Sequence, residues 1–278
     1  MEIVNFLDFG RREQLRQWLT EHAAEGGECW VACNRGKTLR DDSIPYVEVV
    51  EEALCFGWID STLKRLPDGR NAQRLSPRRK GGHWTTLNLQ RCADLVRRGL
   101  MTSAGMKALP TDYHLRLATA DDIPLAWDII EQAKAQMLRE GRKQWDDTYP
   151  TLEILNEDVA QQRGYVLTDN DIVVAYAAVV FDGEPAYDHL EGQWLCHQPY
   201  VVVHRLAVAQ IAQGRGTARF FLTEVERMAH DRGVKSFRID TKSDNLAMLR
   251  VFEHCGFTFC GHITYRHNGN RMAFEKLL

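Results

Sequence analysis

The chain has 278 residues, of which 44% are hydrophobic, and its 35 basic and 38 acidic side chains give a formal net charge of −3. This length accommodates two domains of ordinary size, and the composition excludes a disordered chain. No apolar run reaches the roughly 18 residues of a membrane span, and the first residues lack the pattern of a signal peptide. We therefore expect a cytoplasmic protein without a membrane span. Seven cysteines without a C-x-x-C pair predict neither a disulfide framework nor a metal site.

The first 110 residues predict a small domain of mixed α/β type. Residues 11–22 carry apolar side chains at helical spacing, and residues 28–33 form an apolar run typical of a buried strand. Pro45 suits the first turn of a helix that ends near Gly57, because the missing N–H of proline would have no partner there. This order of elements predicts one compact α/β unit.

Four short motifs in this part of the chain are more particular than generic helix and turn sequences. They are A-L-C-F-G-W-I-D-S at 53–61, Q-R-L-S-P-R-R at 73–79, W-T-T-L-N at 84–88 and G-L-M-T-S-A-G at 99–105. Together they resemble the YdeI/OmpD-associated family, also called bacteriocin-protection proteins. That resemblance implies a role in resistance to cationic antimicrobial peptides at the cell envelope, without implying a reaction.

Residues 64–107 are rich in basic side chains beside an aromatic one, Trp84. Five basic residues lie close together in the sequence with Trp84 nearby: Arg70, Arg74, Arg78, Arg79 and Lys80. Basic and aromatic residues in alternation indicate either a phosphate or nucleic-acid surface or a solvated face. We favour the solvated face because no nucleic-acid-binding motif accompanies the charges. Trp58 and Trp84 either line a pocket, together with Phe56, Asp60 and Asn88, or belong to the core.

From Tyr113 onward the sequence predicts a sheet with flanking helices. Asp121 and Pro124 are typical of a helix N-terminus. The first expected elements are a strand at 114–118, this helix, a loop at 141–149, a helix at 150–163, a hairpin of strands at 165–168 and 172–181, and an insertion at 182–199.

The centre of this second part is an apolar strand at 201–208, followed by a glycine-containing turn and an amphipathic helix that ends near Arg232. Gly214 and Gly216 allow the backbone to curl tightly, and the first N–H groups of the helix point into such a turn. This arrangement favours an anionic ligand. Neither G-x-G-x-x-G nor G-x-x-x-x-G-K-[ST] is present, which excludes the two commonest phosphate loops.

Two motifs in this region occur together at a suitable distance. The first is Gln213-x-x-Gly216-x-Ala218, and the second is N-L-A-M-L-R-V-F-E-H-C-G-F at 245–257, after a strand at 236–241. They resemble the pyrophosphate loop and the N-x-x-[AM] helix of the GNAT superfamily of N-acetyltransferases. The resemblance covers about residues 113–278 and implies an acetyl-CoA-dependent enzyme. We therefore predict two α/β (α+β) domains, at 1–110 and 111–278, the second with a central mixed sheet flanked by helices.

The GNAT resemblance also implies a set of coenzyme-binding residues. The strand is expected to part from its neighbour after Leu206, so that main-chain groups pair with pantetheine, while the loop binds pyrophosphate and Asn245 holds the thiol arm. Arg215 or Arg219 would add positive charge near the 3′-phosphate. The expected coenzyme-binding residues are Leu206, Ala207, Val208, Gln213, Gly214, Arg215, Gly216, Thr217, Ala218 and Asn245.

Acetyl transfer to an amine requires removal of a proton from the amine and protonation of the thiolate. His204 is the candidate base, because strand alternation places it on one face with Leu206 and Val208; the alternative is a structural histidine. The family often uses a tyrosine as the acid, at the position that Phe252 occupies here. Tyr265 is the nearest replacement, and water is the other route.

Acceptor-binding candidates come from two loops. Trp145 and Tyr149 resemble acceptor-side residues of one GNAT subgroup, and Glu191 and Trp194 lie in the insertion, where Asp188 is a further candidate. Alternatively, the aromatic residues are hydrophobic anchors. The acidic excess of residues 111–278 favours a cationic small-molecule or peptide amine. Because Phe252 lacks a proton, a non-catalytic stress-protection protein with a coenzyme-sensing domain is the alternative function.

Overall fold

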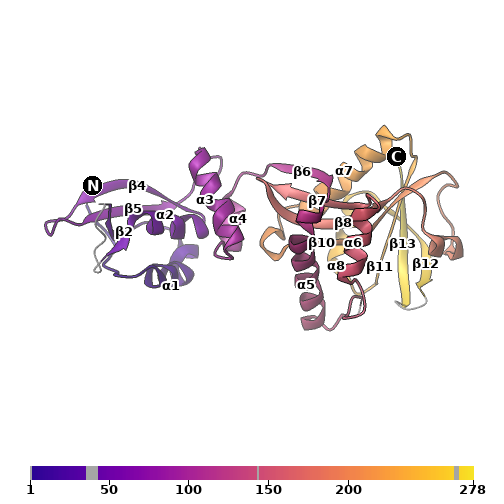
Figure 1. Cartoon of the computed structure of the whole chain (residues 1–278), viewed down its shortest axis with the longest axis horizontal. Helices are drawn as coiled ribbons and strands as arrows, with labels where there is room; N and C mark the ends of the chain where they lie inside the picture. Colours follow the sequence, from indigo (N-terminus) through magenta and orange to yellow (C-terminus); the bar gives the residue numbers. More distant parts are fainter. Residues whose placement is uncertain (1, 36–42, 143, 266–268) are drawn as a thin grey trace. The chain divides into compact units, whose positions relative to one another are not determined.

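The structure is a computed structural model that describes residues 2–35, 43–142, 144–265 and 269–278. It divides into two compact units, Met1–Thr111 and Asp112–Leu278, which are drawn in Figure 1. Within the described ranges, none of the helices has both the length and the apolarity needed to cross a membrane.

The first unit is built on a twisted sheet with helices packed against it. The strand order is β1 (Phe6–Leu7), β2 (Cys29–Asn34), β5 (Asn71–Pro77) and β4 (Trp58–Arg65), with β3 (Ile44–Pro45) beside β2. The helices are α1 (Arg12–His22), α2 (Tyr46–Cys55), α3 (Thr86–Arg97) and α4 (Ser103–Ala108). Trp58 is 1% exposed and packs with Leu15 and Leu19, so it belongs to the core rather than to a pocket.

The basic residues of the first unit are partly neutralised by nearby carboxylates. Arg70 pairs with Asp8 and Asp68, and Arg74 pairs with Glu28. The guanidinium of Arg78 lies 3.5 Å from the ring centroid of Trp84. Arg79 and Lys80 are exposed. These local pairs favour a solvated face over a phosphate-binding surface.

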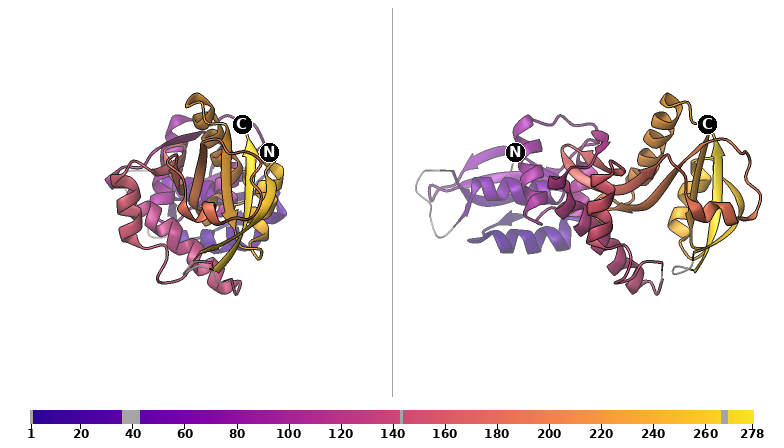
Figure 2. Two further views of the ribbon diagram at one scale, coloured as in Figure 1. Left: turned by 90° about the vertical axis from the view of Figure 1, so that its right-hand side faces the viewer. Right: turned by 45° about the vertical axis from the view of Figure 1, so that its right-hand side comes forward.

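The second unit contains one mixed sheet, as the sequence predicts. Its strand order is β6 (Tyr113–Leu117), β7 (Gly164–Asp169), β8 (Ile172–Val180), β10 (Tyr200–Val208), β11 (Ser236–Thr241), β13 (Gly269–Leu277), β12 (Thr258–Tyr265) and β9 (Glu191–Gly192). Strands β10 and β11 are parallel, and the hairpin of β12 and β13 continues the sheet antiparallel to β11. Figure 2 shows this hairpin in yellow.

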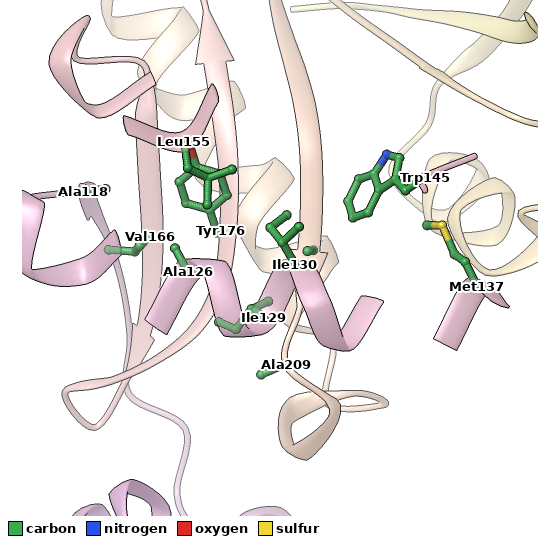
Figure 3. Close-up of a cluster of buried hydrophobic side chains, with 11 residues drawn as sticks. Ala118, Ala126, Ile129, Ile130, Met137, Trp145, Leu155, Val166, Tyr176 and Ala209 are labelled. Atoms are coloured by element: carbon green, nitrogen blue, oxygen red, sulfur yellow. The ribbon is translucent and has the colours of Figure 1, made fainter. Parts of the chain in front are cut away.

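Four longer helices flank this sheet: α5 (Ile123–Arg139), α6 (Leu152–Ala160), α7 (Thr217–Asp231) and α8 (Leu246–His254). Helix α5 buries Ala126, Ile129 and Ile130 in a cluster with side chains of β7 and β8. Figure 3 shows these α5 side chains, with Trp145 and Met137 at the other end of the cluster. The apolar stripe of α5 thereby fixes the loop that carries Trp145 against the sheet.

Strand β10 separates from β11 well before its own end. The two strands pair only from Tyr200 to Val202, although β11 continues to Thr241. On the other side, the pairing with β8 shifts between His204 and Ala207, and Arg205 has φ +58°. This β-bulge leaves one extra residue on β10. The opening between β10 and β11 therefore begins at Val203, earlier than the expected position after Leu206.

Asp122 at the start of α5 gives a first testable prediction. Its carboxylate accepts bonds from Arg116 at 2.6 and 2.8 Å and from Thr119 N–H at 2.8 Å. The Arg116 bonds lower the pKa of Asp122 to about 2, although burial opposes the shift. The carboxylate therefore stabilises the fold fully above about pH 4 and loses this contribution as the pH falls towards 2. We expect Asp122→Asn to lower the free energy of unfolding by about 1–2 kcal/mol at pH 7.

Urea denaturation at pH 7 and at pH 3 checks this expectation. The difference between Asp122→Asn and the parent chain should shrink at pH 3. Asp128→Asn, at an exposed position of the same helix, is the matched control and should change stability little at either pH. An equal loss for Asp122→Asn at both pH values would contradict the assigned role of the carboxylate.

Candidate active site

A cavity of about 380 Å³ lies beside β10 and the N-terminus of α7. It contains nine of the ten residues that the sequence assigns to the coenzyme: Leu206, Ala207, Val208, Gln213, Gly214, Gly216, Thr217, Ala218 and Asn245. Apolar side chains such as Met137, Trp145 and Val251 form much of the remaining wall. The wall of this cavity therefore combines a largely apolar part with a glycine-containing loop.

The loop has the geometry of an anion site. Gly214 and Gly216 have φ values of +74° and +80°, and a Cβ atom at either position would project into open space. Gly216 is the N-cap of α7, and no side chain among the described residues caps this helix end. The first N–H groups of α7 point out of the helix without an intrahelical acceptor. The loop fits a pyrophosphate, which would accept bonds from these groups.

The two arginines of this region have different roles. Nη1 of Arg215 lies 2.6 Å from Oδ2 of Asp169, and both side chains are buried. Arg215 is therefore absent from the cavity wall, and its side chain fastens the loop to β7 instead of facing a phosphate. Arg219, in the first turn of α7, lines the cavity. Of the two arginines proposed for the 3′-phosphate, Arg219 has the suitable position.

Asn245 lines the cavity, but its side chain is engaged in local structure. Its Oδ1 accepts a bond from the N–H of Met248 at 3.4 Å, which caps α8, and its Nδ2 donates to Thr241 at 3.2 Å. These bonds make Asn245 a residue that positions α8 against β11, in addition to its place in the wall. Further along α8, Phe252 is 1% exposed and packs against Phe257 and Phe274. The usual position of the tyrosine is thus part of the core.

A second cavity of about 170 Å³ lies where β10 diverges from β11. It brings together four residues that the sequence proposes for catalysis or acceptor binding: Trp145, Tyr149, His204 and Tyr265. The other residues of its wall are Gln144, Glu184, Val203, Arg205, Asp240 and Arg271. Trp145 lines both cavities, so the two are neighbours.

His204 is paired with a carboxylate that the sequence does not single out. Its Nε2 lies 3.1 Å from Oε2 of Glu184, whose Oε1 accepts the N–H of Ala186 at 3.0 Å. Burial alone would raise the pKa of Glu184, but the bonds from His204 and Ala186 outweigh it and lower the pKa. Glu184 therefore stays ionised and orients the imidazole of His204.

The expected alternation of His204, Leu206 and Val208 on one face of the strand is wrong. The extra residue at Arg205 breaks the two-residue repeat, so His204 borders the second cavity while Leu206 and Val208 border the first. The bulge thus assigns neighbouring residues of one strand to two adjacent cavities. This is a common use of bulges beside functional sites.

Tyr265 is held by Asp240. Its hydroxyl donates to Oδ2 of Asp240 at 3.1 Å, and Tyr187 donates to the same oxygen at 2.9 Å. Burial, followed by the charge of Asp240, raises the pKa of Tyr265 well above its usual range. The raised pKa makes Tyr265 a weaker acid than a free tyrosine. The geometry therefore argues against the expected role of Tyr265 as proton donor to a thiolate.

The side chain of Arg205, at the bulge, donates hydrogen bonds to two neighbouring residues. Its Nε and Nη2 donate to Asp158 at 3.1 and 2.6 Å, and its Nη1 donates to the hydroxyl of Tyr149 at 3.2 Å. All three nitrogens thus have an acceptor within the protein. Arg205 and Asp158 hold Tyr149 in the wall of the second cavity.

Glu191 and Trp194 do not belong to either of these cavities, contrary to expectation. Glu191 is exposed in β9, which pairs with β12 at the edge of the sheet. Trp194 donates to the carbonyl of Tyr187 at 3.1 Å and packs on Arg238, so it is a structural anchor. The insertion reaches the second cavity through Glu184 instead. Nothing in the local sequence separates Glu184 from the other acidic residues of this segment.

Comparisons with known proteins agree with this geometry. Residues 127–257 match the family model described as the acetyltransferase (GNAT) family, and residues 7–108 match one described as a domain of unknown function (DUF8412). The resemblance of the first unit to YdeI/OmpD-associated proteins is thus not confirmed. A comparison with curated proteins finds no match.

Solved structures resemble the second unit. The GNAT-family acetyltransferase from Streptococcus agalactiae 2603 aligns with 29% identity and a TM-score of 0.55, over 60% of this chain and 95% of that protein. A GNAT-family acetyltransferase from Listeria monocytogenes 4b F2365 aligns with 15% identity and a TM-score of 0.49, over 60% of this chain and 95% of that one. Enzymes of this family use acetyl-CoA as acetyl donor. The second unit is a GNAT-family acetyltransferase domain, and the chain is therefore an acyltransferase.

Proposed function

We propose that this enzyme transfers the acetyl group of acetyl-CoA to a primary amine by direct attack of the amine on the thioester. The observation that carries the proposal is the adjacency of two cavities that share Trp145. One has an anion-binding loop at its end, and the other contains a histidine paired with a carboxylate. Direct transfer needs the donor and the acceptor side by side, since no covalent enzyme intermediate is formed.

The residues of the first cavity suit the coenzyme. The N–H groups at the start of α7 would bind the pyrophosphate, Arg219 would add positive charge, and the unpaired main chain near Leu206 would bind the pantetheine amides. Bound acetyl-CoA supplies an activated acetyl carbon with a thiolate leaving group. Trp145, in the shared wall, would exclude water from the reacting atoms.

The residues of the second cavity suit the acceptor amine. An alkylammonium has a pKa near 10, so it must lose a proton before it attacks. We assign this proton transfer to His204, oriented by Glu184. The nitrogen then forms a bond to the acetyl carbon and loses its second proton to water, the carbon–sulfur bond breaks, and its electron pair stays on sulfur. Water protonates the thiolate, because Phe252 leaves no hydroxyl at the usual position.

A non-catalytic coenzyme sensor is the less favoured alternative. Its main support is the missing proton donor at Phe252. A thiolate leaves readily without an acid, so this substitution does not prevent transfer. A sensor would also have no use for a half-buried histidine–carboxylate pair beside the coenzyme cavity.

A thiol-release assay tests the proposed function. Full-length protein with acetyl-CoA is mixed with separate polyamines, aminoglycosides, amino acids and cationic peptides. We expect stoichiometric thiol and N-acetyl product with at least one amine. If calorimetry shows tight coenzyme binding but no amine causes release of thiol from acetyl-CoA, the result would favour the sensor instead.

Tyr265→Phe separates the two roles considered for this tyrosine. If Tyr265 only helps Tyr187 to hold Asp240, we expect turnover to fall less than about tenfold, with an unchanged Kd for acetyl-CoA. A general acid would instead contribute roughly 10²- to 10⁴-fold to turnover. Steady-state kinetics on the amine identified above decides between them, and a loss above about 100-fold would restore the acid role.

A further inference from the structure

The second cavity contains two arginines, and they differ in how well their donors are satisfied. Arg205 donates from all three nitrogens to Asp158 and Tyr149. Arg271, on β13, has a side chain only 7% exposed, and its hydrogen-bond partner among the described residues is Asp240, at the long distance of 3.4 Å from Nη1. Its Nε is buried without an acceptor, and no described residue accepts a bond from its Nη2. A buried guanidinium nitrogen without an acceptor is costly.

Asp240 does not fully compensate this charge. Its Oδ2 already accepts the hydroxyls of Tyr187 and Tyr265, at 2.9 and 3.1 Å. Oδ1 faces Arg271 at a distance longer than a charge-assisted hydrogen bond usually has. Asp240 thus acts as a support that fixes Arg271 in the wall of the cavity, while much of the donor capacity of the guanidinium is left for a ligand.

The same cavity holds the opposite charge at a separate position. Glu184 and His204 form the pair to which we assign the acceptor ammonium and its proton. A ligand that satisfies both positions carries an amine and an oxyanion within the reach of a cavity of about 170 Å³. That volume suits a small molecule or the end of a chain rather than a folded surface.

We propose that the acceptor is a small amino acid, whose amine faces the His204–Glu184 pair and whose carboxylate binds the guanidinium of Arg271. This inference rests on the proposed function for the amine and adds the carboxylate as the second recognised group. It replaces the expectation of a purely cationic acceptor, because the charges that line this cavity are of both signs. A planar guanidinium is the side chain best matched to a carboxylate.

The test compares acceptors that differ only in the carboxylate. Each small amino acid is assayed beside its carboxamide and its decarboxylated amine, with acetyl-CoA and full-length protein. We expect kcat/KM for the preferred amino acid to exceed that of its carboxamide by about 10- to 100-fold, the usual worth of a charge-assisted bond. Arg271→Gln should remove this preference mainly through KM, and leave the rate with the decarboxylated amine within about threefold.

Two further variants distinguish the loss of carboxylate binding from a general change in structure. Arg271→Lys keeps the positive charge but loses the planar pair of N–H groups that matches a carboxylate. It should therefore retain part of the preference for the amino acid over its carboxamide. Arg227→Gln, at a position on α7 that is 63% exposed, should keep all of it. The thermal midpoint and the Kd for acetyl-CoA are measured for every variant, so that a folding defect is recognised. An equal loss for the amino acid and the decarboxylated amine in a folded Arg271→Gln would overturn the inference.

The outcomes separate this inference from the proposed function. If amines are acetylated without preference for the carboxylate, the inference fails and the acetyltransferase proposal stands. If no amine is acetylated, calorimetric titration of the coenzyme A complex with the twenty amino acids decides. Binding that is lost in Arg271→Gln would keep the carboxylate site and overturn only the transfer reaction. No binding and no turnover would overturn both.

Discussion

His204→Ala is expected to lower kcat/KM for amine acetylation by about 10²- to 10⁴-fold, the usual contribution of a general base. The imidazole borders the second cavity and is held by Glu184 at 3.1 Å, so its removal leaves the acceptor ammonium without an oriented base. The coenzyme cavity lies on the other side of the bulge, and the Kd for acetyl-CoA should not change. Product formation measured at fixed times gives kcat/KM, and calorimetry gives the Kd for acetyl-CoA.

The pH dependence tells a base from a structural histidine. In the parent enzyme, kcat/KM should rise with pH along one limb that reports deprotonation of the base and a second that reports the acceptor ammonium, and only the first should disappear in His204→Ala. Glu184→Gln keeps the shape of the partner but removes its charge, so a smaller loss of rate is expected. An unchanged profile in His204→Ala, with a lower thermal midpoint, would make the histidine structural.

Gly216→Trp is expected to abolish measurable binding of acetyl-CoA, a loss of more than about 100-fold. The backbone at Gly216 has φ +80°, which costs a side chain roughly 1–2 kcal/mol. A Cβ at this position projects into open space beside the cavity, so the indole would cover the N–H groups of the first turn of α7. Isothermal titration with acetyl-CoA measures the effect.

Gly233→Trp is the matched control for this substitution. Gly233 follows the other end of α7, has φ +70°, and a Cβ at this position would likewise meet nothing within 4 Å. It carries the same backbone strain without lying beside the coenzyme cavity. Gly233→Trp should therefore lower stability to a similar degree and leave the Kd intact. Equal losses of affinity in the two variants would indicate strain rather than blocking of the loop.

The coenzyme side of the site can be predicted from the sequence because it is local. The strand at 201–208, the glycines of the turn and the start of α7 follow one another along the chain, so their spacing alone indicates an anion site. The same holds for the helix that follows Asn245. Trp145 and Tyr149 also come from one short segment, and both lie in the wall of the second cavity.

The rest of the acceptor side could not be predicted because it is assembled by strand order. Glu184, His204, Asp240 and Arg271 come from an insertion and three different strands, and only the sequence of pairings in the sheet makes them neighbours. The bulge at Arg205 has no local signal, since a single extra residue depends on the register of β8. That one residue reverses the predicted grouping of His204 with Leu206.

The ion pair between Arg215 and Asp169 has a consequence for how the coenzyme associates. It ties the glycine-containing loop to β7 through two buried side chains, so the curled shape of the loop is held by the fold itself. The conformational entropy lost in ordering this segment is therefore part of the folding free energy and is not lost again on binding. Such preorganisation favours rapid, nearly rigid docking, with little change in loop dynamics between the free and the bound enzyme.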